Sequence, residues 1–133
     1  MQIIGFGFTE ISIKRKEKAQ GQIQVKQNIN IDELVKNKIS FSDKESVKID
    51  FTFSVDYNDK KFASVEIKGQ VTLLPEKEEL KQIMKSWKDK KLPEDIRTPI
   101  FNFIMTKGNI KALALEDELN LPLHIPFPKI KNQ

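Results

Sequence analysis

The sequence predicts an α+β fold, in which a four-stranded antiparallel sheet is followed by two helices packed on one face. Apolar and polar residues alternate with period two as far as Leu73, and a helical period replaces this alternation after Pro75. A proline-rich segment ends the chain. With 133 residues there is enough chain for one hydrophobic core, so we expect a single domain over residues 1–133.

The first two strands are predicted from alternation with one interruption. The apolar residues of the first strand form two sets of opposite parity: Ile4, Phe6 and Phe8, then Ile11 and Ile13. A β-bulge near Thr9 and Glu10 would keep both sets facing the core. The second strand keeps a single register: Ile23, Val25, Ile29 and Ile31. The polar residues 16–22 between the strands include Gly21 and predict a turn or short loop.

The third and fourth strands form the clearest pattern in the chain. Their apolar residues alternate with polar ones: Val47, Ile49, Phe51, Phe53, Val55 and Tyr57, then Val65, Ile67, Val71 and Leu73. Turn-forming residues at 58–61 separate the two runs, so the sequence predicts an antiparallel hairpin with one buried face and one solvent-exposed face. Residues 32–45 have no clear pattern, and the crossover of a Greek-key sheet could lie there.

Two helices are predicted next. Pro75 fits the first position of the first helix, whose apolar stripe is Leu80, Ile83, Met84 and Trp87. Leu92 and Pro93 interrupt the pattern, and a second helix is expected from about Thr98, as N-cap before Pro99, to Glu118. Gly108 would bend this helix or allow a close approach. Prolines make residues 119–130 extended, and their apolar side chains require a partner surface.

Composition limits the chemistry. The chain has no cysteine, which excludes disulfides and thiolate sites, and its only histidine, His124, is expected to be a packed or surface residue. We find no catalytic set, nucleotide motif or metal cluster, so we expect no enzyme and no cofactor. Basic residues follow the apolar N-terminus instead of preceding it, and no apolar run is long enough to span a membrane, so a cytoplasmic location is expected.

The net charge of +4 comes mainly from lysine, since Arg15 and Arg97 are the two arginines. Lysine spread along a chain is typical of a solvated surface. A nucleic-acid-binding module that uses a lysine-rich face is the alternative function, because lysine clusters also attract phosphates. Its binding would weaken strongly with salt.

The helical half contains more apolar surface than one sheet face can bury. Phe101 and Phe103 lie about 200° apart around a helix at 100° per residue, so they cannot both face the sheet. The C-terminal segment or another subunit could cover the second face, as in a structural or adaptor protein. The other interpretation is a groove for apolar segments, to which methionine and aromatic side chains are suited.

These features resemble those of the SecB export chaperones, over roughly residues 5–127. The similarities are an aromatic first strand (GFGFTEIS, 5–12), the long hairpin ending at Leu73, and the closing segment LALEDELNLPLHIPFPKI (113–130). The resemblance implies an ATP-independent holding chaperone, self-associated as a dimer or tetramer, that binds unfolded polypeptide clients in apolar grooves. The groove residues it implies are Met84, Trp87, Leu92, Ile96, Phe101, Phe103 and Met105.

The chain departs from the SecB pattern in two respects. The cysteine-containing, zinc-binding C-terminal extension of that family is missing. The sheet surface that is acidic in the family has mixed charge here: Lys48, Asp50, Asp56, Glu66 and Lys68. These departures argue against engagement of a SecA-type motor, whereas holding of clients does not require either feature.

Overall fold

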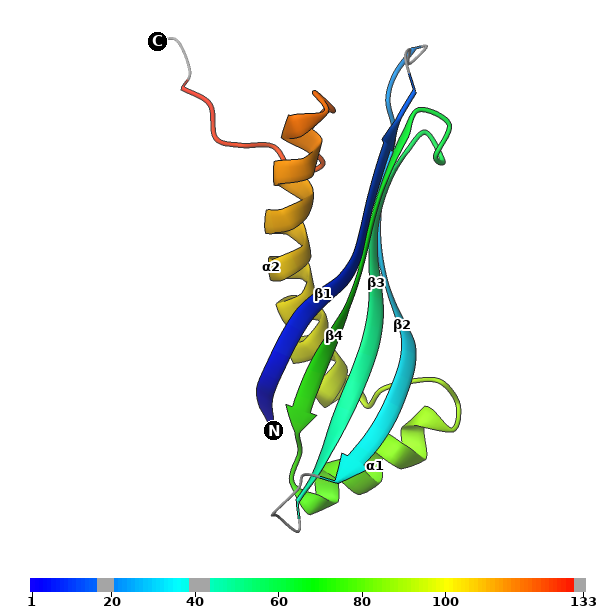
Figure 1. Cartoon of the computed structure of the whole chain (residues 1–133), viewed down its shortest axis with the longest axis vertical. Coiled ribbons are helices and arrows are strands. Elements are labelled where there is room, and N and C mark those ends of the chain that lie inside the picture. The colour runs from blue at the N-terminus through cyan, green and yellow to red at the C-terminus, as the bar shows by residue number, and fades with distance from the viewer. Residues whose placement is uncertain (17–20, 39–43, 131–133) are drawn as a thin grey trace.

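The structure is a computed structural model that describes residues 1–16, 21–38 and 44–130. Its elements are β1 (Gln2–Arg15), β2 (Val25–Lys38), β3 (Glu45–Tyr57), β4 (Ala63–Leu74), α1 (Lys77–Trp87) and α2 (Glu94–Glu118). The strands form one antiparallel sheet, α2 lies along one of its faces, and α1 lies at its lower end in Figure 1. The predicted α+β fold of four antiparallel strands followed by two helices is therefore confirmed.

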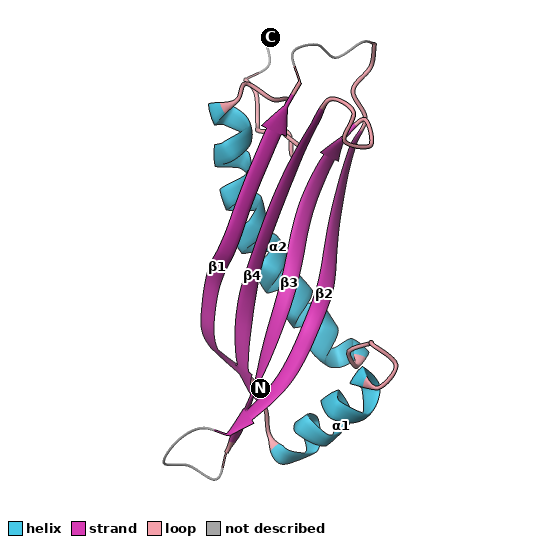
Figure 2. Ribbon diagram, turned by 45° about the vertical axis from the view of Figure 1, so that its right-hand side comes forward, coloured by secondary structure: helices cyan, strands magenta, loops and turns pink. Residues whose placement is uncertain are grey.

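The sheet has a Greek-key order, β1-β4-β3-β2. Strands β2, β3 and β4 follow one another as neighbours, while β1 lies beside β4, so the crossover is the connection from β1 to β2. The crossover suggested for residues 32–45 is therefore wrong. Residues 32–38 continue β2, which stays paired with β3 up to Lys38 opposite Glu45, and residues 39–43 lie outside the described part of the chain. As a result β1 and β2 are the two edges of the sheet (Figure 2).

Two register shifts shape β1. The shift between Phe8 and Glu10 lies where the change of parity predicted a bulge. A second shift, between Ile3 and Gly5, was not predicted. It places Ile3 against the core and leaves Ile4 49% exposed, so the inward placement expected for Ile4 is wrong.

The hydrophobic core lies between the sheet and α2. Its α2 side consists of residues spaced by four: Ile96, Ile100, Ile104, Gly108, Ala112 and Glu116. Because four residues exceed one helical turn of 3.6, this stripe winds around α2, and the helix crosses the sheet obliquely (Figure 2). A Cβ at Gly108 would lie 2.6 Å from the Phe53 ring, so the glycine permits the close approach that the sequence suggested.

The starts of both helices differ from prediction. In α1 the N-cap is Glu76, which forms a capping box with Glu79, so Pro75 precedes the helix instead of occupying its first turn. In α2 the N-cap is Pro93, not Thr98, and Pro99 lies inside the helix. Burial of Ile96 on the sheet holds the additional first turn of α2 in place, and tertiary packing outweighs the local preference against an internal proline.

The sheet face opposite α2 is polar and open to solvent. The alternate residues of β3 and β4 that point away from the core are partly exposed and include both signs of charge: Lys48, Asp50, Asp56, Glu66 and Lys68. Lys68 lies 3.8 Å from carboxylate oxygens of both Glu10 and Glu66. The mixed charge expected for this face is thus present on one continuous surface.

Candidate functional site

A groove lies between the edge strand β2, the connection from α1 to α2, and the first turns of α2. We call it the Trp87 groove, and its volume is about 210 Å³. It is lined by Ile29, Asn30, Ile31, Trp87, Lys90, Lys91, Leu92, Arg97 and Phe101. The lining therefore combines five apolar or aromatic side chains with three cations.

Each wall of the Trp87 groove has a local structural cause. In β2, Ile29 and Ile31 pair with Phe53 and Phe51 of the buried face of β3, so they point to the side of the sheet that α2 covers. Trp87 is the last residue of α1 and is 8% exposed. The chain turns at Lys90, which has a positive φ of 58°. The Lys90 ammonium lies 5.0 Å from the centroid of the Trp87 ring and forms a cation–π contact with it.

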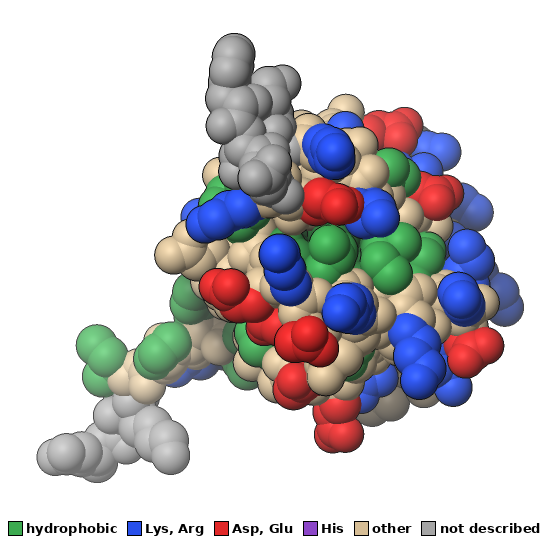
Figure 3. Space-filling model, turned by 90° about the horizontal axis from the view of Figure 1, so that it is seen from below, with side chains coloured by type: hydrophobic (Ala, Val, Ile, Leu, Met, Phe, Trp, Pro, Cys, Tyr) green, Lys and Arg blue, Asp and Glu red, His purple; other side chains and the backbone are tan. Residues whose placement is uncertain are grey.

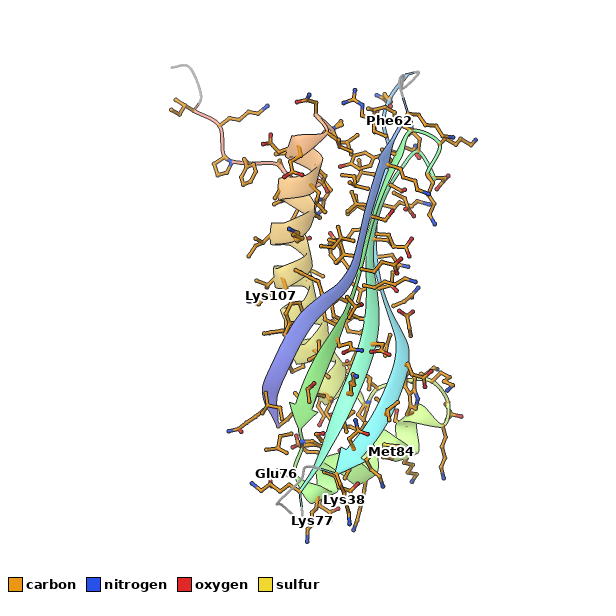
Figure 4. All side chains as sticks on the ribbon, in the orientation of Figure 1. Lys38, Phe62, Glu76, Lys77, Met84 and Lys107 are labelled. Carbon is orange, nitrogen blue, oxygen red and sulfur yellow. The ribbon has the colours of Figure 1, made fainter. Side chains whose placement is uncertain are left out.

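A second hollow, which we call the lower cleft, lies between α1 and the lower end of the sheet. It is lined by Met1, Gln2, Lys36, Lys44, Glu45, Leu74, Pro75, Glu76, Lys77, Glu78, Leu80, Lys81 and Met84. Seen from below, apolar side chains at this end are surrounded by cations and carboxylates (Figure 3). Figure 4 places Met84, Glu76 and Lys77 at this end of the molecule. Unlike the Trp87 groove, the lower cleft has both signs of charge in its lining.

The seven residues predicted to line a groove do not form one site. Trp87, Leu92 and Phe101 meet in the Trp87 groove, whereas Met84 lines the lower cleft. The other three line neither hollow: Ile96, Phe103 and Met105. The long helix α2 points its apolar residues in several directions, and its rotation relative to the sheet decides which of them reach a groove.

The three residues outside the hollows have separate surroundings. Ile96 is 2% exposed and belongs to the core. Phe103 packs edge-on against Phe6 of β1, with ring centroids 5.4 Å apart. Met105 is 40% exposed on the surface of α2. None of the three is placed to contact a ligand in the Trp87 groove.

Sequence reasoning missed the β2 wall and the cations of the Trp87 groove. Ile29 and Ile31 were recognised as strand residues, but the pattern along one strand does not tell whether that strand lies at the edge of a sheet. The sequence alone assigns no role to Arg97, which is one of the two arginines. The available signal was its position in the sequence between Leu92, just before α2, and Phe101, in the first half of α2.

The opposite edge of the sheet has an aromatic cluster. The Phe6 ring contacts those of Phe8, Phe51 and Phe103 at centroid distances of 5.1, 5.9 and 5.4 Å. The Lys107 ammonium lies 5.8 Å from the Phe103 centroid. On the same strand, Phe8 and Ile11 are 36% and 41% exposed. Among the described strands β1 pairs with β4 alone, so this edge combines a strand edge without a described partner and exposed apolar side chains.

His124 belongs to a buried polar cluster that holds the C-terminal segment on α2. Its Nδ1 lies 2.7 Å from Glu116 Oε2 and its Nε2 lies 2.8 Å from Asn109 Oδ1. The side chains of Glu116 and His124 are 0% and 1% exposed. The Tyr57 hydroxyl donates to the Pro122 carbonyl, and burial, followed by the nearby Glu116 carboxylate, raises the Tyr57 pKa. The cluster adjoins neither hollow, so we assign it a structural role.

No metal site, membrane-spanning helix or known relative adds to this assignment in the part of the chain that the structure describes. Within residues 1–16, 21–38 and 44–130, no cluster of three or more histidine or acidic side chains could hold a metal ion. None of the helices in those ranges is long and apolar enough to cross a membrane. Comparisons with models of protein families, with curated proteins and with solved structures found no match to this chain.

Proposed function

We propose that this protein is an ATP-independent holding chaperone, similar in layout to the SecB export chaperones, that binds unfolded polypeptide at the Trp87 groove. The main supporting observation is the convergence of Ile29, Ile31, Trp87, Leu92 and Phe101 on an open groove beside an edge strand. Apolar side chains from an unfolded client would be removed from water there.

The edge strand adds a second mode of contact. Among the described strands β2 pairs with β3 alone, so the backbone along its other side is available to an extended segment. A client strand would gain main-chain hydrogen bonds from this edge and specificity from side chains placed in the groove. Burial of one large apolar side chain contributes about 1.5–3 kcal/mol. A few such contacts give the weak, reversible binding that a holding protein requires.

The β1 edge supports self-association as part of this proposal. Phe8 and Ile11 are partly exposed there, and Ile4, further along the same strand, is 49% exposed. A second copy placed along β1 would cover this apolar surface, giving a dimer or a higher oligomer such as a tetramer. We propose no SecA-type motor as a partner, because the polar sheet face has mixed charge.

The proposal is tested by light scattering of a denatured client diluted with and without the protein. We expect wild-type protein to suppress aggregation near equimolar ratio, and Phe101→Gln to suppress it less because the groove loses an aromatic wall. Met105→Gln is the matched control, since Met105 is exposed on the same helix and lines neither hollow. Absence of suppression by the wild type, or equal loss in both variants, would contradict the proposal.

A further inference from the structure

We infer that the Trp87 groove selects apolar segments that also carry carboxylates, so that its preferred ligands are acidic, aromatic-containing stretches of polypeptide. This inference rests on the proposed function and specifies its substrate class. It comes from the charges around the groove, which are all of one sign among the lining residues.

The lining of the groove has three cations, Lys90, Lys91 and Arg97, and among these described residues none bears a carboxylate. Acidic residues do occur nearby, Asp89 in the connection and Glu94 and Asp95 in the first turn of α2, but none of the three lines the groove. The turn at Lys90, with its positive φ, places the lysines toward the groove. A ligand in this groove therefore meets an apolar floor and a positive rim.

The two arginines have different surroundings. Arg15 is engaged within the fold, since its guanidinium donates to the carbonyls of Leu119 and Asn120 and lies over the Phe62 ring. The guanidinium of Arg97 makes no hydrogen bond or ion pair with any residue that the structure describes. Its planar set of five N–H donors matches a carboxylate in a bidentate arrangement. Arg97 is therefore suited to act as the recognition residue of the groove.

The arrangement favours an acidic segment over a neutral one. When an apolar side chain of the ligand lies against Trp87 and Phe101, the adjacent residues of the ligand lie close to Arg97 and the two lysines. Exposed ion pairs each contribute modestly, so three cations together should favour a carboxylate-bearing peptide by about tenfold over its amide counterpart. Salt should reduce this preference because the charges are partly exposed.

The test uses three synthetic peptides that share the same apolar and aromatic residues and differ only in having glutamate, glutamine or lysine at the intervening positions. If the peptides contain phenylalanine instead of tryptophan, Trp87, the only tryptophan of the chain, reports binding by its fluorescence. Each peptide is titrated into the full-length wild type, Arg97→Gln and Lys88→Gln. Lys88→Gln removes the same charge from a residue outside the groove lining and serves as the matched control.

We expect the glutamate peptide to bind about tenfold more tightly than the glutamine peptide, with the preference falling to about threefold in Arg97→Gln and unchanged in Lys88→Gln. Equal binding of the glutamate and glutamine peptides would overturn the inference and leave the proposed function standing. Failure of all three peptides to bind would overturn both. Displacement of the glutamate peptide by a single-stranded oligonucleotide that binds more tightly would also overturn the inference, in favour of a phosphate ligand.

Discussion

The contact between Gly108 of α2 and Phe53 of β3 sets how closely the helix approaches the sheet, and Gly108→Ala tests it. The new methyl carbon would lie 2.6, 2.8 and 2.9 Å from three atoms of the Phe53 ring. Carbon atoms in contact are normally about 3.5–4.0 Å apart, so helix and ring must separate by about 1 Å. Phe53 is fully buried, which leaves its ring no open space to enter.

Two effects of opposite sign determine the stability of Gly108→Ala. Alanine favours the helix by about 1 kcal/mol relative to glycine. Overpacking of a close-packed core costs about 1–3 kcal/mol, and the size of this overlap places it in the upper part of that range. The net result should be a loss of about 1–2 kcal/mol in the free energy of unfolding, measured by urea denaturation. In a thermal scan this corresponds to a fall in Tm of about 3–8 °C.

Gly7→Ala is the matched control, because a Cβ at Gly7 in β1 would meet nothing within 4 Å. We expect this variant to be as stable as the wild type or slightly more stable. The double variant Gly108→Ala/Phe53→Leu should lose less stability than the sum of its single variants, since the smaller side chain relieves the overlap. Wild-type stability or better for Gly108→Ala would refute the claim that this glycine sets the spacing between α2 and the sheet.

Three other predictions concern the end of α2 and the polar cluster beside it. Arg15→Gln should lower the free energy of unfolding by about 1 kcal/mol, because the guanidinium no longer donates to the carbonyls of Leu119 and Asn120 at the end of α2. An unchanged midpoint of urea denaturation would argue against this role. His124→Ala should cost about 1–3 kcal/mol in the free energy of unfolding, because the buried Glu116 carboxylate loses the imidazole and keeps the hydrogen bond from the backbone N–H of residue 124. Replacing Glu116 and His124 together by alanine should lower the free energy of unfolding by less than the sum of the two single substitutions. Strict additivity would show that these two residues are not coupled. Tyr57, the only tyrosine, should stay protonated in the folded protein at pH values where a free tyrosine ionises. The absorbance of tyrosinate, measured as the pH is raised, checks this prediction. Because its pKa is raised on folding, its contribution to stability is present below the unfolded pKa of about 10 and decreases as the pH rises above it.

The class of fold and most of the elements could be predicted from the amino-acid pattern alone. Alternation identified β3 and β4, because each has one face in the core and one in water. The change of parity after Phe8 located a bulge, since the side-chain period of a strand is two and an inserted residue reverses it. These features depend on residues close together in the chain, so the local periodicity of apolar residues is enough to predict them.

The residues that form the Trp87 groove could not be predicted in this way, because they come together through contacts between distant segments. The position of β2 at an edge follows from strand order, which alternation within one strand does not specify. The start of α2 at Glu94 depends on burial of Ile96 against the sheet, which outweighs the local signal at Thr98 and Pro99. The oblique crossing of α2 buries Ile96 and brings Phe101 to the groove. Each of these outcomes depends on contacts between segments far apart in the sequence, whose free energy appears only when the sheet and helix are packed together.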